Sequence, residues 1–134
     1  MELNLERPLL FFDIESTGLS IVSDSIVELS FVKVLPDNHH EVKTWRVCPW
    51  DYAAGKQKSI DPGASQVNGI KDEDVANEPK FIEIAPEVVE WLKDSDLAGY
   101  NSTKFDLPML AEEIERVRTY CESRIKSAKT SADK

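Results

Sequence analysis

Two acidic residues separated by one position close an apolar run near the start of the 134-residue sequence. Asp13 and Glu15 follow residues 9–12, which read L-L-F-F. Because alternate side chains of a strand point the same way, both carboxylates are expected on one face of a largely buried strand, at its carboxyl end. Negative charges this close repel each other unless a cation lies between them. The pair therefore indicates a metal-binding site.

A third carboxylate, Asp106, follows another strand-like segment, residues 97–101. Sites in open α/β sheets form where strands end in this way. Each acidic position also has an ordinary alternative. Asp13 and Glu15 could be turn formers after a strand, and Asp106 lies where a helix cap is expected, two residues before Pro108. Together they offer three hard oxygen ligands of the kind that Mg²⁺ or Mn²⁺ prefers.

Two sequence motifs carry a resemblance to a known family. Residues 12–19 read F-D-I-E-S-T-G-L and residues 101–110 read N-S-T-K-F-D-L-P-M-L. In this order, with residues 60–75 between them, they resemble the first two motifs of the DnaQ-like 3′–5′ exonucleases, the DEDD-type proofreading and trimming nucleases. The resemblance implies an α/β, RNase H-like mixed sheet with flanking helices. It also implies metal-dependent hydrolysis of phosphodiester bonds at the 3′ end of single-stranded DNA or RNA, and it favours the site interpretation over turns and caps.

The resemblance also implies a role for each residue. Asp13 would bridge two metal ions, Glu15 would serve the ion that orients the water, and Asp106 would act on the second ion. The implied substrate-binding residues are Ser16, Thr17, Gly18, Leu19, Asn101 and Phe105. For Leu19 and Phe105, ordinary core packing is an equally weighted alternative. The implied cofactors are Mg²⁺ or Mn²⁺, with two ions in a complete site.

The family's third motif is not found in the sequence. It would supply a fourth carboxylate shortly after a His or Tyr that prepares the attacking water. The only Asp after Asp106 is Asp133, and no His follows His40. We therefore expect a C-terminally incomplete domain whose activity is weakened, since general-base assistance contributes about 10²–10⁴-fold. The alternatives are a catalytically inactive module that binds a nucleic-acid end or a partner protein, and an interaction domain without a nucleic-acid role.

Composition limits the classes of protein that the chain could be. The formal net charge of −9 argues against broad, charge-driven binding of a nucleic-acid backbone. No run approaches the length of a membrane span, and the two cysteines are unpatterned, which predicts a soluble, cytoplasmic protein. The expected partners are a 3′ end of single-stranded DNA or RNA and a polymerase or other subunit, with no membrane.

The elements that must position these residues follow from hydrophobic periodicity and turn signals. Strands are expected at residues 9–14, 25–35, 41–48 and 97–101, and helices at 62–68, 79–92 and 108–125. The second and third strands would form a hairpin, and the first would lie beside the fourth. A bend or break is expected at Pro86, residues 49–59 are expected to be loop, and the domain, residues 1–125, would end in a frayed polar tail, 126–134. An uncovered sheet edge would favour self-association.

Overall fold

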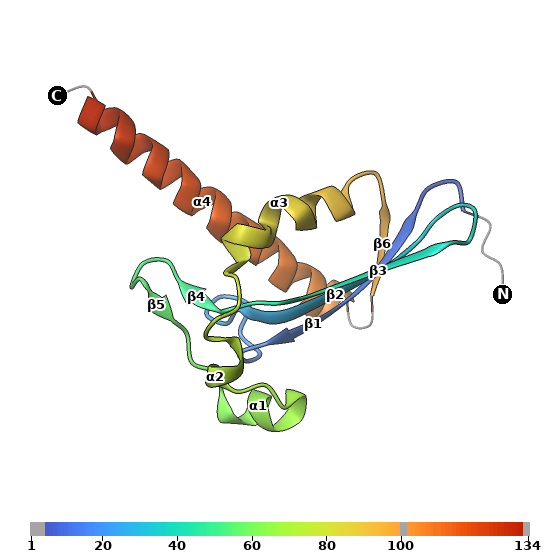
Figure 1. Ribbon diagram of the computed structural model, residues 1–134, viewed down its shortest axis with the longest axis horizontal. Helices are drawn as coiled ribbons and strands as arrows, with labels where there is room; N and C mark the ends of the chain where they lie inside the picture. The colour runs from blue at the N-terminus through green and yellow to red at the C-terminus, as the bar shows by residue number, and fades with distance from the viewer. Residues whose placement is uncertain (1–4, 100–101, 133–134) are drawn as a thin grey trace.

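The computed structural model describes residues 5–99 and 102–132, in which α3 and α4 lie over one face of a mixed sheet (Figure 1). The strands of this sheet are β1 (Leu9–Ser16), β2 (Ile26–Val34), β3 (His40–Arg46) and β6 (Asp96–Gly99). A smaller hairpin consists of β4 (Trp50–Asp51) and β5 (Lys56–Gln57). The helices are α1 (Pro62–Asn68), α2 (Asp72–Val75), α3 (Phe81–Leu92), the π-helical turn η1 (Ser102–Asp106) and α4 (Leu107–Ala132).

The strand order of the sheet is β3-β2-β1-β6. β1 is antiparallel to β2 and parallel to β6, and β2 is antiparallel to β3. The predicted hairpin and the predicted pairing of the first strand with the fourth are both confirmed. In the parallel pair, the register runs from Leu9↔Asp96 to Phe12↔Gly99. Asp13 therefore lies just beyond the last of these pairs, where β1 continues toward the turn.

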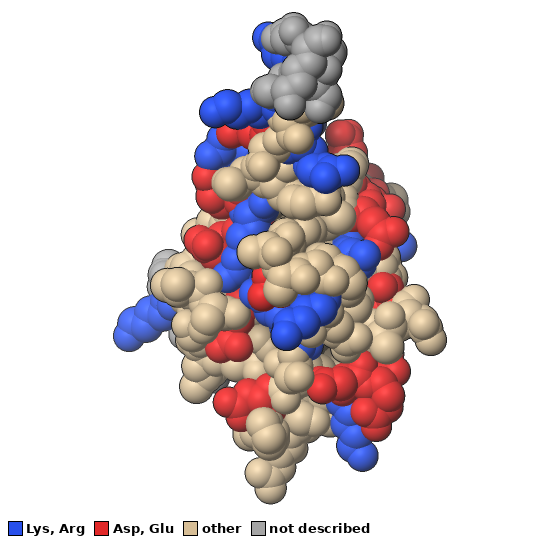
Figure 2. Space-filling model, turned by 90° about the vertical axis from the view of Figure 1, so that its left-hand side faces the viewer, with Lys and Arg blue, Asp and Glu red and all other residues tan. Residues whose placement is uncertain are grey.

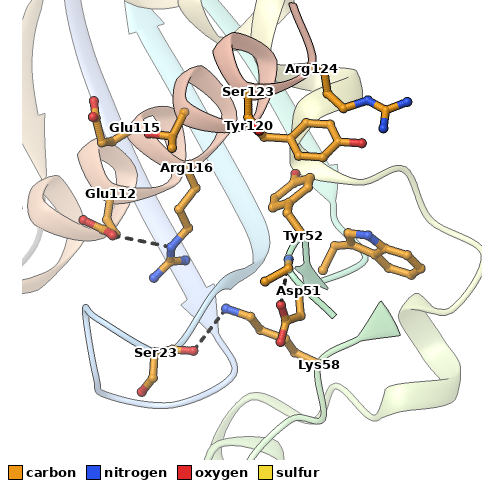
Figure 3. A pocket seen from close by; sticks show the side chains of 13 residues that line it. Ser23, Asp51, Tyr52, Lys58, Glu112, Glu115, Arg116, Tyr120, Ser123 and Arg124 are labelled. Atoms are coloured by element: carbon orange, nitrogen blue, oxygen red, sulfur yellow. Dashed lines mark hydrogen bonds and ion pairs between the residues drawn. The ribbon is translucent and has the colours of Figure 1, made fainter. Parts of the chain in front are cut away.

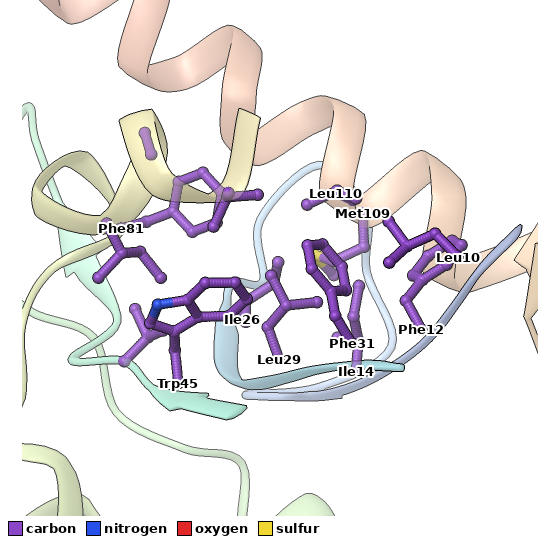
Figure 4. Packing of buried hydrophobic residues seen from close by; sticks show 14 residues of the cluster. Leu10, Phe12, Ile14, Ile26, Leu29, Phe31, Trp45, Phe81, Met109 and Leu110 are labelled. Atoms are coloured by element: carbon purple, nitrogen blue, oxygen red, sulfur yellow. The ribbon is translucent and has the colours of Figure 1, made fainter. Parts of the chain in front are cut away.

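The hydrophobic core lies between the sheet and the two long helices (Figure 4). In β1, Leu10, Phe12 and Ile14 are buried and pack into this core, as alternation along a strand requires. From the helices, Phe81 of α3 and Met109 of α4 close the core from above. Because successive side chains alternate, the sequence that buries the core residues turns the intervening acidic residues to the other face of the sheet.

Local signals explain why α1 begins and ends where the sequence predicts. Asp61 accepts a hydrogen bond from the Gly63 amide at 2.8 Å, and Pro62 occupies the first helical position. Gly69 ends the helix with φ 74°, in the left-handed region that suits glycine. α1 contains no buried residue, so its side chains can line surface features of the protein.

Three expectations about secondary structure are corrected. The segment expected to be loop contains the short β4–β5 hairpin. α3 runs through Pro86 without a break. The proline removes one backbone hydrogen bond, but the helix stays continuous because Ile84 and Val88 remain buried against the sheet. The frayed tail is not observed up to Ala132, since α4 continues to that residue and projects beyond the rest of the fold (Figure 1).

Charges of both signs are interspersed over the face shown in Figure 2. Within the described parts of the chain, no helix combines the length and the apolar character needed to cross a membrane.

Candidate active site

The acidic pair lies at the carboxyl end of β1, as predicted. Asp13 is exposed and Glu15 is half-buried, both on the face of the sheet opposite the core. Burial raises the pKa of Glu15, and the negative charges of Asp13 and Glu28 raise it further. Glu28 faces Glu15 across the β1–β2 pair and forms an ion pair with Arg46 at 3.2 Å. The end of β1 is thus a region of concentrated negative charge.

Asp106 lies at the end of η1, immediately before α4, and is only 4% exposed. Burial raises its pKa from 3.8 to about 6, and the charges of Asp13 and then Glu15 add to the effect. The structure therefore brings the three predicted carboxylates into one electrostatic environment. Within residues 5–99 and 102–132, the buried Oδ2 atom of Asp106 has no hydrogen-bond partner. A buried, unpaired carboxylate oxygen beside like charges is costly, and that cost needs an explanation.

The chemistry of these donors fits a divalent cation, since carboxylate oxygens are the ligands that Mg²⁺ and Mn²⁺ prefer. The unpartnered Oδ2 of Asp106 is a free lone-pair donor of this kind. As the side chains stand, however, residues 5–99 and 102–132 contain no group of three His, Cys, Asp or Glu side chains arranged to hold a metal ion. The donors are near one another without forming a ready-made ligand set.

A cleft of about 370 Å³ lies beside this acidic region. Of the predicted substrate-binding residues, it is lined by Ser16, Gly18, Leu19 and Phe105, and Glu15 also reaches it. Leu19 is 87% exposed, so the core-packing alternative is wrong for this residue. Phe105 is partly buried against the core and also borders the cleft, so it serves both interpretations.

The opposite wall of the cleft comes from α1 and was missed in the sequence. Ala64, Val67 and Asn68 line it, and Val67 is 89% exposed. Two exposed apolar side chains, Leu19 and Val67, thus contribute to one cleft. The sequence signal that could have revealed this wall was Val67, an apolar residue in a helix that has no hydrophobic stripe to bury. Gly69 ends α1 in the left-handed conformation, and Asn68, the last residue of the helix, lines the cleft.

The side chain of Asn68 connects α1 to the carboxyl end of β1. Its Nδ2 donates to the Ser16 carbonyl at 3.4 Å, and its Oδ1 accepts from the Ile70 amide at 2.9 Å. A residue that ends the helix therefore also fixes the wall of the cleft.

Two of the predicted substrate-binding residues do not line the cleft with described side chains. Thr17 is buried, and its hydroxyl donates to Asp24 at 2.7 Å and accepts from the Ser25 amide at 3.0 Å. Its side chain therefore supports the turn. Asn101 lies outside the described residues. Within the turn, the Ser16 hydroxyl donates to the Gly18 carbonyl at 2.6 Å.

The fold and the position of the acidic residues together define a class. A mixed sheet ordered β3-β2-β1-β6, with helices packed on it, is the architecture of RNase H-like α/β domains. The model of the family described as Exonuclease (RNase_T) matches residues 10–132. The chain belongs to this exonuclease family.

Curated relatives include subunits of replicative polymerases. The chain is 27% identical over 124 residues to DNA polymerase III PolC-type of Caldanaerobacter subterraneus subsp. tengcongensis, covering 92% of this chain and 8% of the relative. It is 27% identical over 103 residues to DNA polymerase III subunit epsilon of Treponema pallidum, covering 77% and 44%. It is 32% identical over 109 residues to Protein NEN2 of Arabidopsis thaliana, covering 80% and 22%. The chain thus spans less than half the length of each of these relatives.

Solved structures give the same fold. Escherichia coli exonuclease I in complex with a dT13 oligonucleotide aligns with a TM-score of 0.66 and 18% identity, covering 84% of this chain and 23% of that one. A zinc-bound form of the complex of E. coli exonuclease I with single-stranded DNA aligns with a TM-score of 0.67, again with 18% identity and coverage of 84% and 23%. At this level of identity, the likeness establishes the fold.

Proposed function

We propose that this chain is a metal-dependent 3′–5′ exonuclease domain acting on single-stranded nucleic acid, with Asp13, Glu15 and Asp106 as its metal-binding carboxylates. The observation that carries the proposal is the buried Oδ2 of Asp106. It lies near the charges of Asp13 and Glu15 and has no hydrogen-bond partner in the part of the chain that the structure describes. A cation would relieve this arrangement, whereas turn formation or helix capping would not require it. Membership of the exonuclease family supports the reaction class.

The carboxylates would hold the metal ion, and the cleft would contact the substrate. When bound, Mg²⁺ or Mn²⁺ would lower the pKa of a water molecule and offset charge on the phosphodiester. Asp106, whose pKa is about 6 in the metal-free protein, would give up its proton as the cation takes that position. Leu19, Phe105 and Val67 offer apolar surface to a terminal base beside the acidic region. The complex of the E. coli relative with dT13 supports a single-stranded substrate.

A specific feature of the sequence favours a second candidate. After Asp106 these 134 residues contain no His, and Tyr120 is not followed by an Asp four positions later, so neither form of the family's water-preparing motif is found among them. A module that binds a strand end without hydrolysing it would need no such group. Polymerase-subunit relatives make a polymerase assembly the natural setting for either function.

The test is an oligonucleotide labelled at its 5′ end, so that shortening from the 3′ end gives a ladder. We expect binding and, with Mn²⁺, slow shortening that Asp106→Asn abolishes. The matched control is Asp96→Asn, an exposed aspartate on β6. Binding without any shortening would favour the second candidate. Neither binding nor shortening would contradict both, and fast Mn²⁺-dependent shortening that persists in Asp106→Asn would contradict the assigned site.

A further inference from the structure

Arg116 of α4 is bonded to a loop that lies far from it in the sequence. Its Nη1 donates to the Asp24 carbonyl at 2.8 Å and to the Ser25 hydroxyl at 3.2 Å. Its Nη2 donates to the carbonyls of Ile21 and Val22 at 2.9 and 3.0 Å. One guanidinium therefore binds four hydrogen-bond acceptors on residues 21–25, a geometry that its planar fork suits and an ammonium does not.

Arg116 is held in place by a buried carboxylate of its own helix. Glu113 accepts from Arg116 Nη1 at 2.6 Å and is 4% exposed, while the Arg116 side chain is 16% exposed. Burial raises the pKa of Glu113, and the charge of Arg116 opposes that rise. Because buried Glu113 accepts this hydrogen bond, the partly buried guanidinium of Arg116 has little freedom to move away from the loop.

A second cation, Lys58, lies in the same pocket as Arg116 and bonds the same loop (Figure 3). Lys58 donates to the Ser23 carbonyl at 3.1 Å and to the Ser25 hydroxyl at 2.8 Å. Burial lowers the pKa of Lys58, and the nearby charge of Arg116 lowers it further. The two hydrogen bonds to the loop offset part of this cost.

Residues 20–25, which are held in this way, belong to a loop that comprises residues 17–25. This loop carries one wall of the cleft through Gly18 and Leu19. Asp24 ties its two ends together, because it accepts from the Thr17 hydroxyl at 2.7 Å and from the Ser20 amide at 2.9 Å. Gly18 is packed so closely that an added Cβ would lie 2.5 Å from Asp24. Leu19 lies at the exposed tip of this closed loop and lines the cleft.

We propose that Arg116 is a positioning residue that sets Leu19 at the cleft by fastening residues 20–25 to α4. The same helix follows directly from Asp106, so one element positions both a candidate metal ligand and the substrate-facing loop. The effect on substrate rests on the proposed function, whereas the fastening of the loop does not.

The experiment compares Arg116→Lys, which keeps the charge but loses the fork, with Arg116→Gln, which loses both. Arg118→Lys and Arg118→Gln are matched controls, because Arg118 is exposed and forms ion pairs with Glu115 and Glu122 of its own helix. Amide hydrogen exchange of Asp24 and Ser25 reports on the loop, and exchange in β2 reports on the core. Fluorescence anisotropy with a single-stranded oligonucleotide reports on binding at a temperature where all variants are folded.

We expect loop exchange to rise about tenfold in Arg116→Lys, which keeps a positive charge beside Glu113 but loses the forked hydrogen bonds, with β2 changed less. Oligonucleotide binding should weaken severalfold in Arg116→Gln and less in Arg116→Lys, and both Arg118 variants should resemble the wild type. Unchanged loop exchange, or equal acceleration in loop and β2, would overturn the fastening role. A loosened loop with unchanged binding would overturn the positioning role. If the wild-type chain binds no oligonucleotide, the proposed function and the substrate part of the proposal both fail, and exchange alone decides the fastening.

Discussion

Asp106 and Glu113 are equally buried carboxylates, each 4% exposed, about two helical turns apart on the η1–α4 element. Glu113 is paired with Arg116, whose charge opposes the rise in its pKa. Asp106 has an oxygen without a hydrogen-bond partner and two acidic neighbours that raise its pKa further. The paired carboxylate is explained by the fold alone, whereas the unpaired one is explained by a ligand that the fold does not supply.

The largest expected effect concerns the paired carboxylate. Arg116→Met should lower the free energy of unfolding by about 3–5 kcal/mol, because it leaves Glu113 buried and uncompensated. Urea denaturation measures this loss. Arg118→Met removes an exposed arginine from the same helix and should lower the free energy of unfolding far less. Equal losses in the two variants would mean that the buried pair differs little from a surface pair.

Replacing the unpaired carboxylate, Asp106, should raise the free energy of unfolding at neutral pH instead of lowering it. The pKa of Asp106 is raised from 3.8 to about 6, so the folded protein binds this proton more tightly than the unfolded chain. That contribution to stability is complete below about pH 4 and is lost as the pH rises to about 6. Without divalent metal, Asp106→Asn should therefore stabilise the protein at neutral pH by up to about 3 kcal/mol.

Urea midpoints in EDTA, measured at acidic and neutral pH, test this expectation. The gain in Asp106→Asn should be present at neutral pH and small at about pH 4. Asp96→Asn, at an exposed position on β6, should differ from the wild type by no more than about 0.5 kcal/mol. Destabilisation by Asp106→Asn at neutral pH would show that Asp106 has a structural partner and would remove the contrast with Glu113.

A bound divalent cation should offset the destabilising charge of Asp106 and stabilise the folded protein. Mn²⁺ at about 100 times its dissociation constant should stabilise the wild-type protein by about 2.7 kcal/mol, provided that only the folded state binds it. Thermal melts with and without Mn²⁺ measure the shift, and Asp13→Ala should reduce it. The same shift in wild type and Asp13→Ala would place the metal elsewhere.

The smallest change in stability is expected at the tip of the loop. Leu19 is 87% exposed, so Leu19→Ala should change the free energy of unfolding by no more than about 0.5 kcal/mol. Binding of a single-stranded oligonucleotide should nevertheless weaken severalfold, because the cleft loses apolar surface. Val22→Ala, at an 84% exposed position in the same loop that does not line the cleft, is the control. Equal binding by both variants would exclude a substrate contact at Leu19.

Much of the fold could be predicted because its strands and helices carry local signals. An apolar run closed by Asp13 and Glu15 marks β1, and Pro62 and Gly69 mark the ends of α1. The β4–β5 hairpin was missed because strands of two residues show no periodicity. The end of α4 was missed because its apolar spacing stops near Ile125, while residues such as Lys and Ala continue to favour the helix.

The acidic residues of the candidate site were visible in the sequence, but their environment was not. Spacing placed Asp13 and Glu15 on one face, and the structure agrees. The burial of Asp106 and its unpartnered oxygen depend on how η1 packs on β1, which no local pattern encodes. Val67 was missed for the same reason, since a single apolar residue in α1 does not reveal that it lines a cleft.

The central claim is that the unpaired Asp106 serves a divalent cation. Calorimetric titration with Mn²⁺ at neutral pH tests it most directly, using the wild type, Asp106→Asn and the control Asp96→Asn. The account predicts binding by the wild type and by the control, and at least about tenfold weaker binding by Asp106→Asn, as expected when a group in or next to the ligand shell is removed. Equal Mn²⁺ affinity in the wild type and Asp106→Asn would contradict it.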